Sequence, residues 1–352
     1  MTSRRMSRYG ATRRDLDAIV ESLGEPRYRA AQIHEGLWGL RRPLDDLTNV
    51  PKRVREQLAE RLPLDLVPVL ERRGDHDLTT KWLWQVAGGD QVETVLMRTA
   101  DRATVCVSSQ AGCAMACTFC ATGQAGFERH LTAAEIVEQV VRAQHASPQR
   151  VGNVVFMGMG EPLANLDEVE PALERLHTDL GLSARHLTVS TVGIVPGIER
   201  LTRFPLPVTL AISLHAPDDA LRDSLVPLNR RYPIADVLDA ARGYVEAKGR
   251  RVTFEYACIS GVNDHPHQAD ALAGRLAGFP GGAHVNLIPL NPTAGYRGDA
   301  PGAGRIATFA DRLTARGITA TVRRNRGTDI DAACGQLRTR TAVPVDLRDS
   351  SP

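Results

Sequence analysis

Three of the six cysteines in this chain of 352 residues lie within eight positions, at Cys113, Cys117 and Cys120. Thiolate sulfur is the ligand that iron–sulfur clusters and zinc prefer, and such short spacings let one turn of backbone bring three sulfurs to one centre. Zinc would need a fourth ligand nearby, such as Cys106 or His130, but neither has a usual metal-site spacing. We therefore expect an iron–sulfur cluster with three protein ligands and one open iron. Structural cysteines gathered by chance are the plain alternative.

A second group of candidates stands where predicted strands end. Residues 154–162 form a strand that runs into a glycine turn, in which Gly160 permits a close backbone approach and Glu161 offers a carboxylate to an ammonium group. Later strands end in polar or glycine-adjacent side chains that would point toward the same edge of a sheet, or alternatively serve as simple caps. These later candidates are Ser190, Ser213, Leu214, His215 and Asn291.

The cysteines outside the cluster differ in their surroundings. Cys334 lies in a small, polar, glycine-bracketed segment, so we expect a nucleophile on a mobile loop and not a core residue. Cys106 lies in the first predicted parallel strand. Cys258 lies within an apolar strand pattern, and we expect it in the core.

These candidates need a scaffold that brings strand ends together. From residue 104 onward, strand patterns alternate with amphipathic helical patterns, which predicts an α/β fold, a partial barrel of six β-α units with right-handed crossovers. The strands are expected at residues 104–108, 153–157, 186–191, 207–214, 251–259 and 284–288. In such folds the chemistry gathers at the carboxyl ends of the strands.

The rest of the chain divides by pattern. We expect a basic tail at 1–10, a helical module at 11–65 with a helix capped by Thr48 or Asn49, a connecting β-hairpin at 66–100, the barrel at 101–342 and a tail at 343–352. Of the 43 basic residues, 40 are Arg, which suits phosphate and base contacts, although a GC-rich genome gives the same bias. No apolar run could span a membrane, and we expect a cytoplasmic protein.

The cluster motif and its flanks, residues 105–113 and 121–127, closely resemble the radical S-adenosylmethionine adenosine C2-methyltransferases of 23S ribosomal RNA and transfer RNA. The resemblance runs from about Asp17 to about Arg340. It implies a [4Fe-4S] cluster on Cys113, Cys117 and Cys120, and two molecules of S-adenosylmethionine per turnover. The residues that would hold S-adenosylmethionine are Gly160, Glu161, Ser190, Ser213, Leu214, His215 and Asn291.

The resemblance also implies a catalytic set. Cys334 would carry the methyl group, Glu93 would be the general base, and Cys106 would resolve the protein–RNA adduct by forming a disulfide. Without the resemblance Glu93 would be read as a solvent-facing strand residue. Basic residues around Cys334 would contact RNA phosphates, unless they form only a solvated charge run; they are Arg323, Arg324, Arg326, Arg338 and Arg340.

Partners follow from the same chemistry: 23S rRNA in the peptidyl transferase centre, the tRNA anticodon loop, a flavodoxin-like electron donor and a thiol reductant. We expect a monomer. Two alternatives stay open, a homologue that methylates C8 of the same adenosine and an RNA-binding protein with a cluster or zinc but no turnover.

Overall fold

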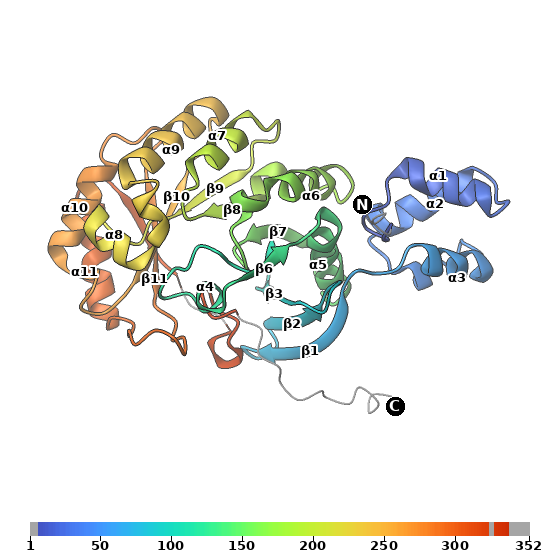
Figure 1. Cartoon of the computed structure of the whole chain (residues 1–352), viewed down its shortest axis with the longest axis horizontal. Helices are drawn as coiled ribbons and strands as arrows, with labels where there is room; N and C mark the ends of the chain where they lie inside the picture. Colours follow the sequence, from blue (N-terminus) through green and yellow to red (C-terminus); the bar gives the residue numbers. More distant parts are fainter. Residues whose placement is uncertain (1–5, 324–326, 338–352) are drawn as a thin grey trace.

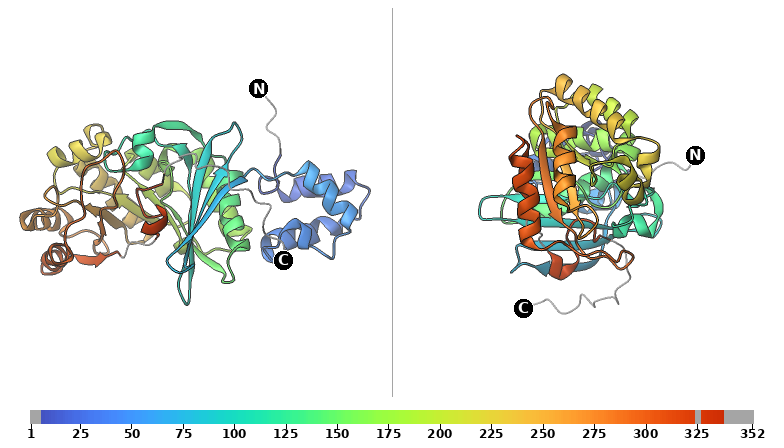
Figure 2. Two further views of the ribbon diagram at one scale, coloured as in Figure 1. Left: turned by 90° about the horizontal axis from the view of Figure 1, so that it is seen from below. Right: turned by 90° about the vertical axis from the view of Figure 1, so that its left-hand side faces the viewer.

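The computed structural model of the chain describes residues 6–323 and 327–337. Its centre is a ten-stranded sheet in the order β1-β2-β3-β4-β7-β8-β9-β10-β11-β12. The strands from β4 to β12 pair in parallel, and helices cover their outer side (Figures 1 and 2). The α/β partial barrel expected from the sequence is confirmed. One parallel strand, β12 (Thr319–Val322), was not expected, because its four residues are too few to show a strand pattern.

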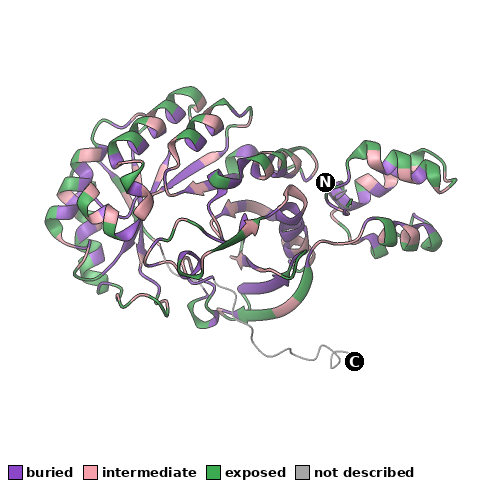
Figure 3. Ribbon diagram, in the orientation of Figure 1, coloured by how far each residue is buried: buried purple, intermediate pink, exposed green. Residues whose placement is uncertain are grey.

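The parallel strands begin with β4 and end with β12. The six that the sequence predicts are β4 (Ala103–Cys106), β7 (Val151–Phe156), β8 (Leu187–Thr191), β9 (Thr209–Ser213), β10 (Thr253–Cys258) and β11 (His284–Pro289). The helices that cover them are α5 (Ala133–His145), α6 (Leu166–Thr178), α7 (Val195–Arg203), α9 (Ile234–Lys248), α10 (Pro266–Leu276) and α11 (Ala303–Thr314). Figure 3 shows the buried residues gathered along the strands and on the helix faces toward them.

The predicted hairpin is larger than expected and belongs to the same sheet. It has three antiparallel strands, β1 (Val67–Gly74), β2 (Thr79–Gln85) and β3 (Gln91–Arg98). The last of these pairs antiparallel with β4, the first barrel strand. The hairpin therefore extends the barrel wall instead of forming a separate connection.

The helical module contains α1 (Arg13–Ser22), α2 (Tyr28–His34) and α3 (Lys52–Arg61), and lies beside the barrel at the end marked by α5 and α6 (Figure 1). Thr12 and Asp15 form a capping box that begins α1. The cap expected at Thr48 or Asn49 is wrong, because Pro51 directly precedes α3 and its side chain can accept no hydrogen bond.

The expectation of a loose tail up to residue 10 is also wrong for the part that the structure describes. Ser7 and Tyr9 are buried, and the Tyr9 ring packs edge-on against Trp38 at 5.6 Å. Arg175 on α6 donates to the carbonyl of Tyr9 and to that of Ala11, both at 2.7 Å, and its guanidinium stacks over Trp38. The segment thus fastens the helical module to the barrel.

Residues 1–5 and 338–352, which include the predicted C-terminal tail, lie outside the described part of the chain. Among the described helices, none is long and apolar enough to cross a membrane.

Candidate active site

A cavity opens at the carboxyl ends of the parallel strands and collects most of the predicted site residues. Its lining includes the three cluster cysteines Cys113, Cys117 and Cys120, together with Gly160, Glu161, Ser190, Ser213, His215, Asn291 and Cys334. Leu214 is not in the lining but fully buried behind it. Neither Glu93 nor Cys106 faces this cavity.

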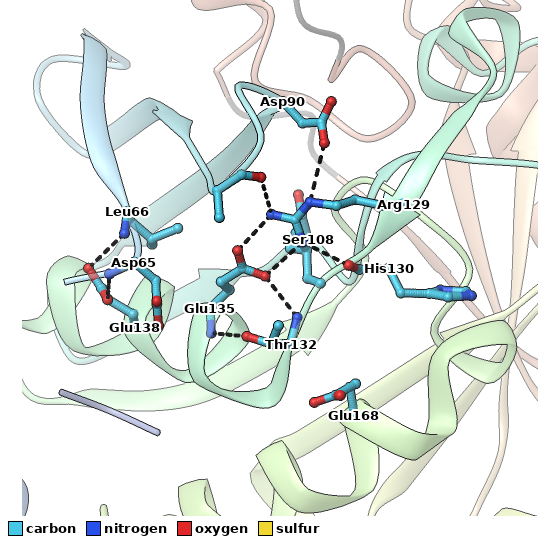
Figure 4. A network of polar contacts seen from close by, with 12 residues as sticks. Asp65, Leu66, Asp90, Ser108, Arg129, His130, Thr132, Glu135, Glu138 and Glu168 are labelled. Atoms are coloured by element: carbon cyan, nitrogen blue, oxygen red, sulfur yellow. Dashed lines mark hydrogen bonds and ion pairs between the residues drawn. The ribbon is translucent and has the colours of Figure 1, made fainter. Parts of the chain in front are cut away.

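The cluster segment is framed by a short antiparallel pair, β5 (Gln110–Gly112) and β6 (Phe127–His130), and by α4 (Ala121–Ala125). Figure 4 shows how β6 is anchored: Arg129 binds Glu135 on α5 at 2.7 Å and Asp90 in the β2–β3 turn at 3.2 Å. These contacts tie the hairpin, the cluster segment and the barrel into one frame.

The electrostatics of the three cysteines indicate a missing positive partner. Burial raises the pKa of Cys113 to about 12 and that of Cys117 well above its ordinary value, and the neighbouring cysteines add to both shifts. Thiols so placed become thiolates only when a cation binds them, so the donor set fits an iron–sulfur cluster.

A single zinc ion fits less well. Cys106 lines a different cavity, and His130 is engaged by Gln110 at 3.0 Å. Among the described residues, no three His, Cys, Asp or Glu side chains are grouped to hold one metal ion.

Glu161 begins the turn after β7 and is only 3 % exposed. Its carboxylate accepts hydrogen bonds from the backbone N–H groups of Leu163 at 3.0 Å and Val192 at 2.9 Å, while burial raises its pKa to about 7. The glycines before it are needed by the fold itself, since a Cβ at Gly158 would lie 2.6 Å from the carbonyl oxygen of Val107. The turn therefore presents one buried carboxylate at a fixed place in the lining.

His215 follows β9 in the left-handed region, with φ of 61°. Its Nδ1 accepts the N–H of Ala257 at 3.0 Å, so the neutral ring carries its proton on Nε2. Burial lowers the pKa of His215 to about 3, which keeps the ring neutral. The site thus holds a neutral hydrogen-bond donor and not an imidazolium.

The strand ends are held by a residue that sequence reasoning missed. Arg222, on the unpredicted helix α8 (Asp219–Leu225), is 0 % exposed and donates to the carbonyls of Leu214 at 3.0 Å and Val192 at 2.6 Å. It also donates to Asn229 Oδ1 at 2.9 Å. A lone arginine in a seven-residue helix carries no sequence signal, because nothing in the pattern says that it is buried.

The segment that carries Cys334 closes one side of the cavity. Asn291 donates to the Cys334 carbonyl at 2.9 Å, and Ala121, directly after the last cluster cysteine, donates to the carbonyl of Gly335 at 2.8 Å. Thr122 adds a bond to the Leu337 carbonyl at 2.5 Å. The segment expected to be a mobile loop is thus fastened by its backbone, with the half-buried Cys334 in the lining.

Cys106 and Cys334 meet at a smaller adjoining cavity that also includes Arg323. Burial, and then the charge of Cys334, raises the pKa of Cys106 to about 12. The pKa of Arg323 is raised chiefly by the Cys334 thiolate, and Glu255 contributes. Arg323 was expected on an RNA-facing surface, but it lies between the two cysteines and the main cavity. Arg324, Arg326, Arg338 and Arg340 lie outside the described residues.

Glu93, on β3, is 4 % exposed, so the solvent-facing alternative is wrong. Its carboxylate lies 3.2 Å from the Lys81 ammonium. Cys258 is buried in the core, as expected, at 1 % exposure.

The chain matches known proteins over nearly its whole length. Residues 107–272 match the model of the radical SAM superfamily. A "Probable dual-specificity RNA methyltransferase RlmN" of Salinispora tropica is 53 % identical, with 91 % of this chain and 89 % of the relative covered. The chain belongs to the RlmN family of radical SAM methyltransferases.

Other members of the RlmN family give the same result. The Chloroflexus aurantiacus relative of the same name is 50 % identical, with 94 % of this chain and 92 % of the relative covered. The crystal structure of a radical SAM methyltransferase from Sphaerobacter thermophilus is 49 % identical and superposes with a TM-score of 0.89 over 95 % of this chain and 99 % of that one. Radical SAM enzymes use a [4Fe-4S] cluster and S-adenosylmethionine.

Proposed function

We propose that this protein methylates C2 of an adenosine in 23S rRNA, and of one in the tRNA anticodon loop, through a methylated Cys334. The observation that carries the proposal is the placement of Cys334, which lines the cavity of the three cluster cysteines and also the adjoining cavity of Cys106. The names of the RlmN relatives, dual-specificity RNA methyltransferases, support both RNA substrates.

In this proposal Cys113, Cys117 and Cys120 bind the cluster. Glu161 and the neutral His215 bind polar groups of S-adenosylmethionine in the cavity that they line, with further contacts from Gly160, Ser190, Ser213, the backbone of Leu214 and Asn291. When bound, the cluster supplies the electron that cleaves S-adenosylmethionine and takes back the electron that the RNA adduct releases.

The chain's own residues perform the remaining steps. The Cys334 sulfur takes a methyl group from one S-adenosylmethionine, and the second removes a hydrogen atom from that methyl, which then bonds to C2. Glu93 accepts the C2 proton. The Cys106 sulfur attacks the Cys334 sulfur, so that an S–S bond forms while the S–CH2 bond breaks. The carbon keeps that electron pair and takes a proton, which completes the methyl group.

Further parts of the proposal concern the surroundings of the site. The helical module at 11–65 and the arginines near Cys334 would hold RNA through its phosphates, with the target base unstacked into the cavity. A flavodoxin-like protein would supply the electron, a thiol reductant would reopen the disulfide, and the enzyme would act as a monomer in the cytoplasm.

The test is mass spectrometry of nucleosides from unmethylated 23S rRNA and tRNA after treatment with reconstituted, reduced enzyme and S-adenosylmethionine. We expect 2-methyladenosine. A product of 8-methyladenosine would overturn the position of methylation, and no methylated adenosine from an enzyme with an intact cluster would overturn the proposed function.

A further inference from the structure

Lys81 is a buried lysine that no sequence pattern singles out. It lies in the middle of β2 and is 7 % exposed. Only three of the 43 basic residues are Lys. Lysine is rarely buried without a partner, because its ammonium loses hydration, so its surroundings should show what the charge does there.

Strand register places Lys81 on the same face as two proposed catalytic residues. Lys81 stands opposite Val95 in the β2–β3 pair, and Val95 stands opposite Cys106 in the β3–β4 pair. Side chains of opposite residues share a face, and Glu93, two residues before Val95, shares it too. One face of the wall therefore carries Lys81, Glu93 and Cys106.

The Lys81 ammonium joins two elements that are far apart in sequence. It lies 3.2 Å from Glu93 Oε1, and it donates to the backbone carbonyl of Asp331 at 3.0 Å. Asp331 precedes Cys334 by three residues. A second contact fastens the same segment to the same wall, since the Gly327 N–H donates to the Asp75 carboxylate at 2.7 Å.

Burial makes the Lys81–Glu93 contact matter. The two side chains are 9 % and 5 % exposed, so little water is available to stabilise a carboxylate at this place. Without an adjacent cation, a buried carboxyl group takes up a proton and can no longer accept one. The other titratable groups of the described chain that share this wall or its cavity are Cys106, Cys334 and Arg323. Of these, only Arg323 is a cation.

We infer that Lys81 is a positioning residue that keeps Glu93 ionised and holds it in register with the segment carrying Cys334. The inference rests on the proposed function, in which Glu93 accepts the C2 proton. Lys81 touches neither RNA nor cofactor in this role; it acts through Glu93 and through the Asp331 carbonyl.

The experiment is a single-turnover assay of the reconstituted full chain with a 23S rRNA fragment, between pH 6 and pH 9. It compares the wild type with Lys81→Met, which removes the charge at nearly the same length, and with Lys81→Arg, which keeps it. Lys248→Met is the matched control, because Lys248 lies on α9 and its ammonium contacts the Phe204 carbonyl. Cys334 methylation, 5′-deoxyadenosine and the protein–RNA adduct are measured separately.

In Lys81→Met we expect normal Cys334 methylation and 5′-deoxyadenosine formation, but release of the adduct slowed at least tenfold at pH 7 and recovering toward pH 9. Lys81→Arg should keep the wild-type pH dependence. In a Glu93→Gln background, Lys81→Met should slow release no further, because both residues act on one proton.

Release by Lys81→Met at the wild-type rate, or slowing that is equal at every pH, would overturn the inference. So would additive losses in the double variant, which also decides the matter if Lys81→Met lowers stability. A wild-type enzyme that makes no methylated adenosine would instead count against the proposed function.

Discussion

Glu138 offers a quantitative test of how the helical module is joined to the barrel. This α5 residue is 0 % exposed, and its carboxylate accepts the backbone N–H groups of Asp65 at 2.8 Å and Leu66 at 3.2 Å, where the module meets β1 (Figure 4). Burial raises its pKa from 4.5 to about 7.

The sign of the effect follows from that direction. A carboxyl group whose pKa is higher in the folded chain stabilises the fold below pH 4.5, and this contribution is lost as the pH rises through 7. A difference of this size corresponds to about 3 kcal/mol in the free energy of unfolding between pH 4.5 and pH 8. Glu138→Gln cannot ionise, so its stability should lack this part of the pH dependence.

The assay is urea unfolding followed by tryptophan fluorescence at several pH values, with Trp38 in the module and Trp82 and Trp84 in the wall as reporters. The difference between Glu138→Gln and the wild type cancels every other titrating group, Glu161 included. Glu174→Gln, on an exposed face of α6, is the control and should follow the wild type. Equal pH dependence of the wild type and Glu138→Gln would refute the reasoning.

Three further predictions concern the site. Cys334→Ala should abolish methyl transfer, whereas Cys106→Ala should accumulate a protein–RNA adduct on denaturing gels; free methylated RNA from Cys106→Ala would contradict the proposed roles. Arg222→Met should lower the free energy of unfolding by about 3 kcal/mol, because buried carbonyls lose their donor, while Arg230→Met at an exposed position should have little effect. Gly158→Ala should cost about 2 kcal/mol, because the backbone of Val107 leaves no room for a Cβ, and an unchanged denaturation midpoint would show that this wall can move.

The sequence predicts those parts of the molecule that depend on local pattern. The six barrel strands and the helices over them follow from periodicity, and the cluster residues follow from spacing alone. β12 and α8 are too short for such patterns, and they bring in Arg323 and Arg222, which sequence reasoning misplaced or missed.

Long-range pairing explains the other differences. The burial of Glu93 depends on β3 pairing with β4, and the neighbour of Lys81 is a carbonyl 250 residues away. Tyr9 is buried because Arg175 binds its carbonyl across the two parts of the chain. No local pattern contains such contacts.

The fastening of the Cys334 segment has a consequence for biosynthesis. The cysteines at 113–120 leave the ribosome more than 200 residues before Cys334, and at typical elongation rates this interval lasts on the order of 10 s or more. During that time the segment cannot yet bond to Ala121 or to Lys81, so one side of the cavity lacks its cover. Nascent chains therefore pass through a stage in which the cluster cysteines are accessible to iron–sulfur delivery from a side that the finished enzyme closes.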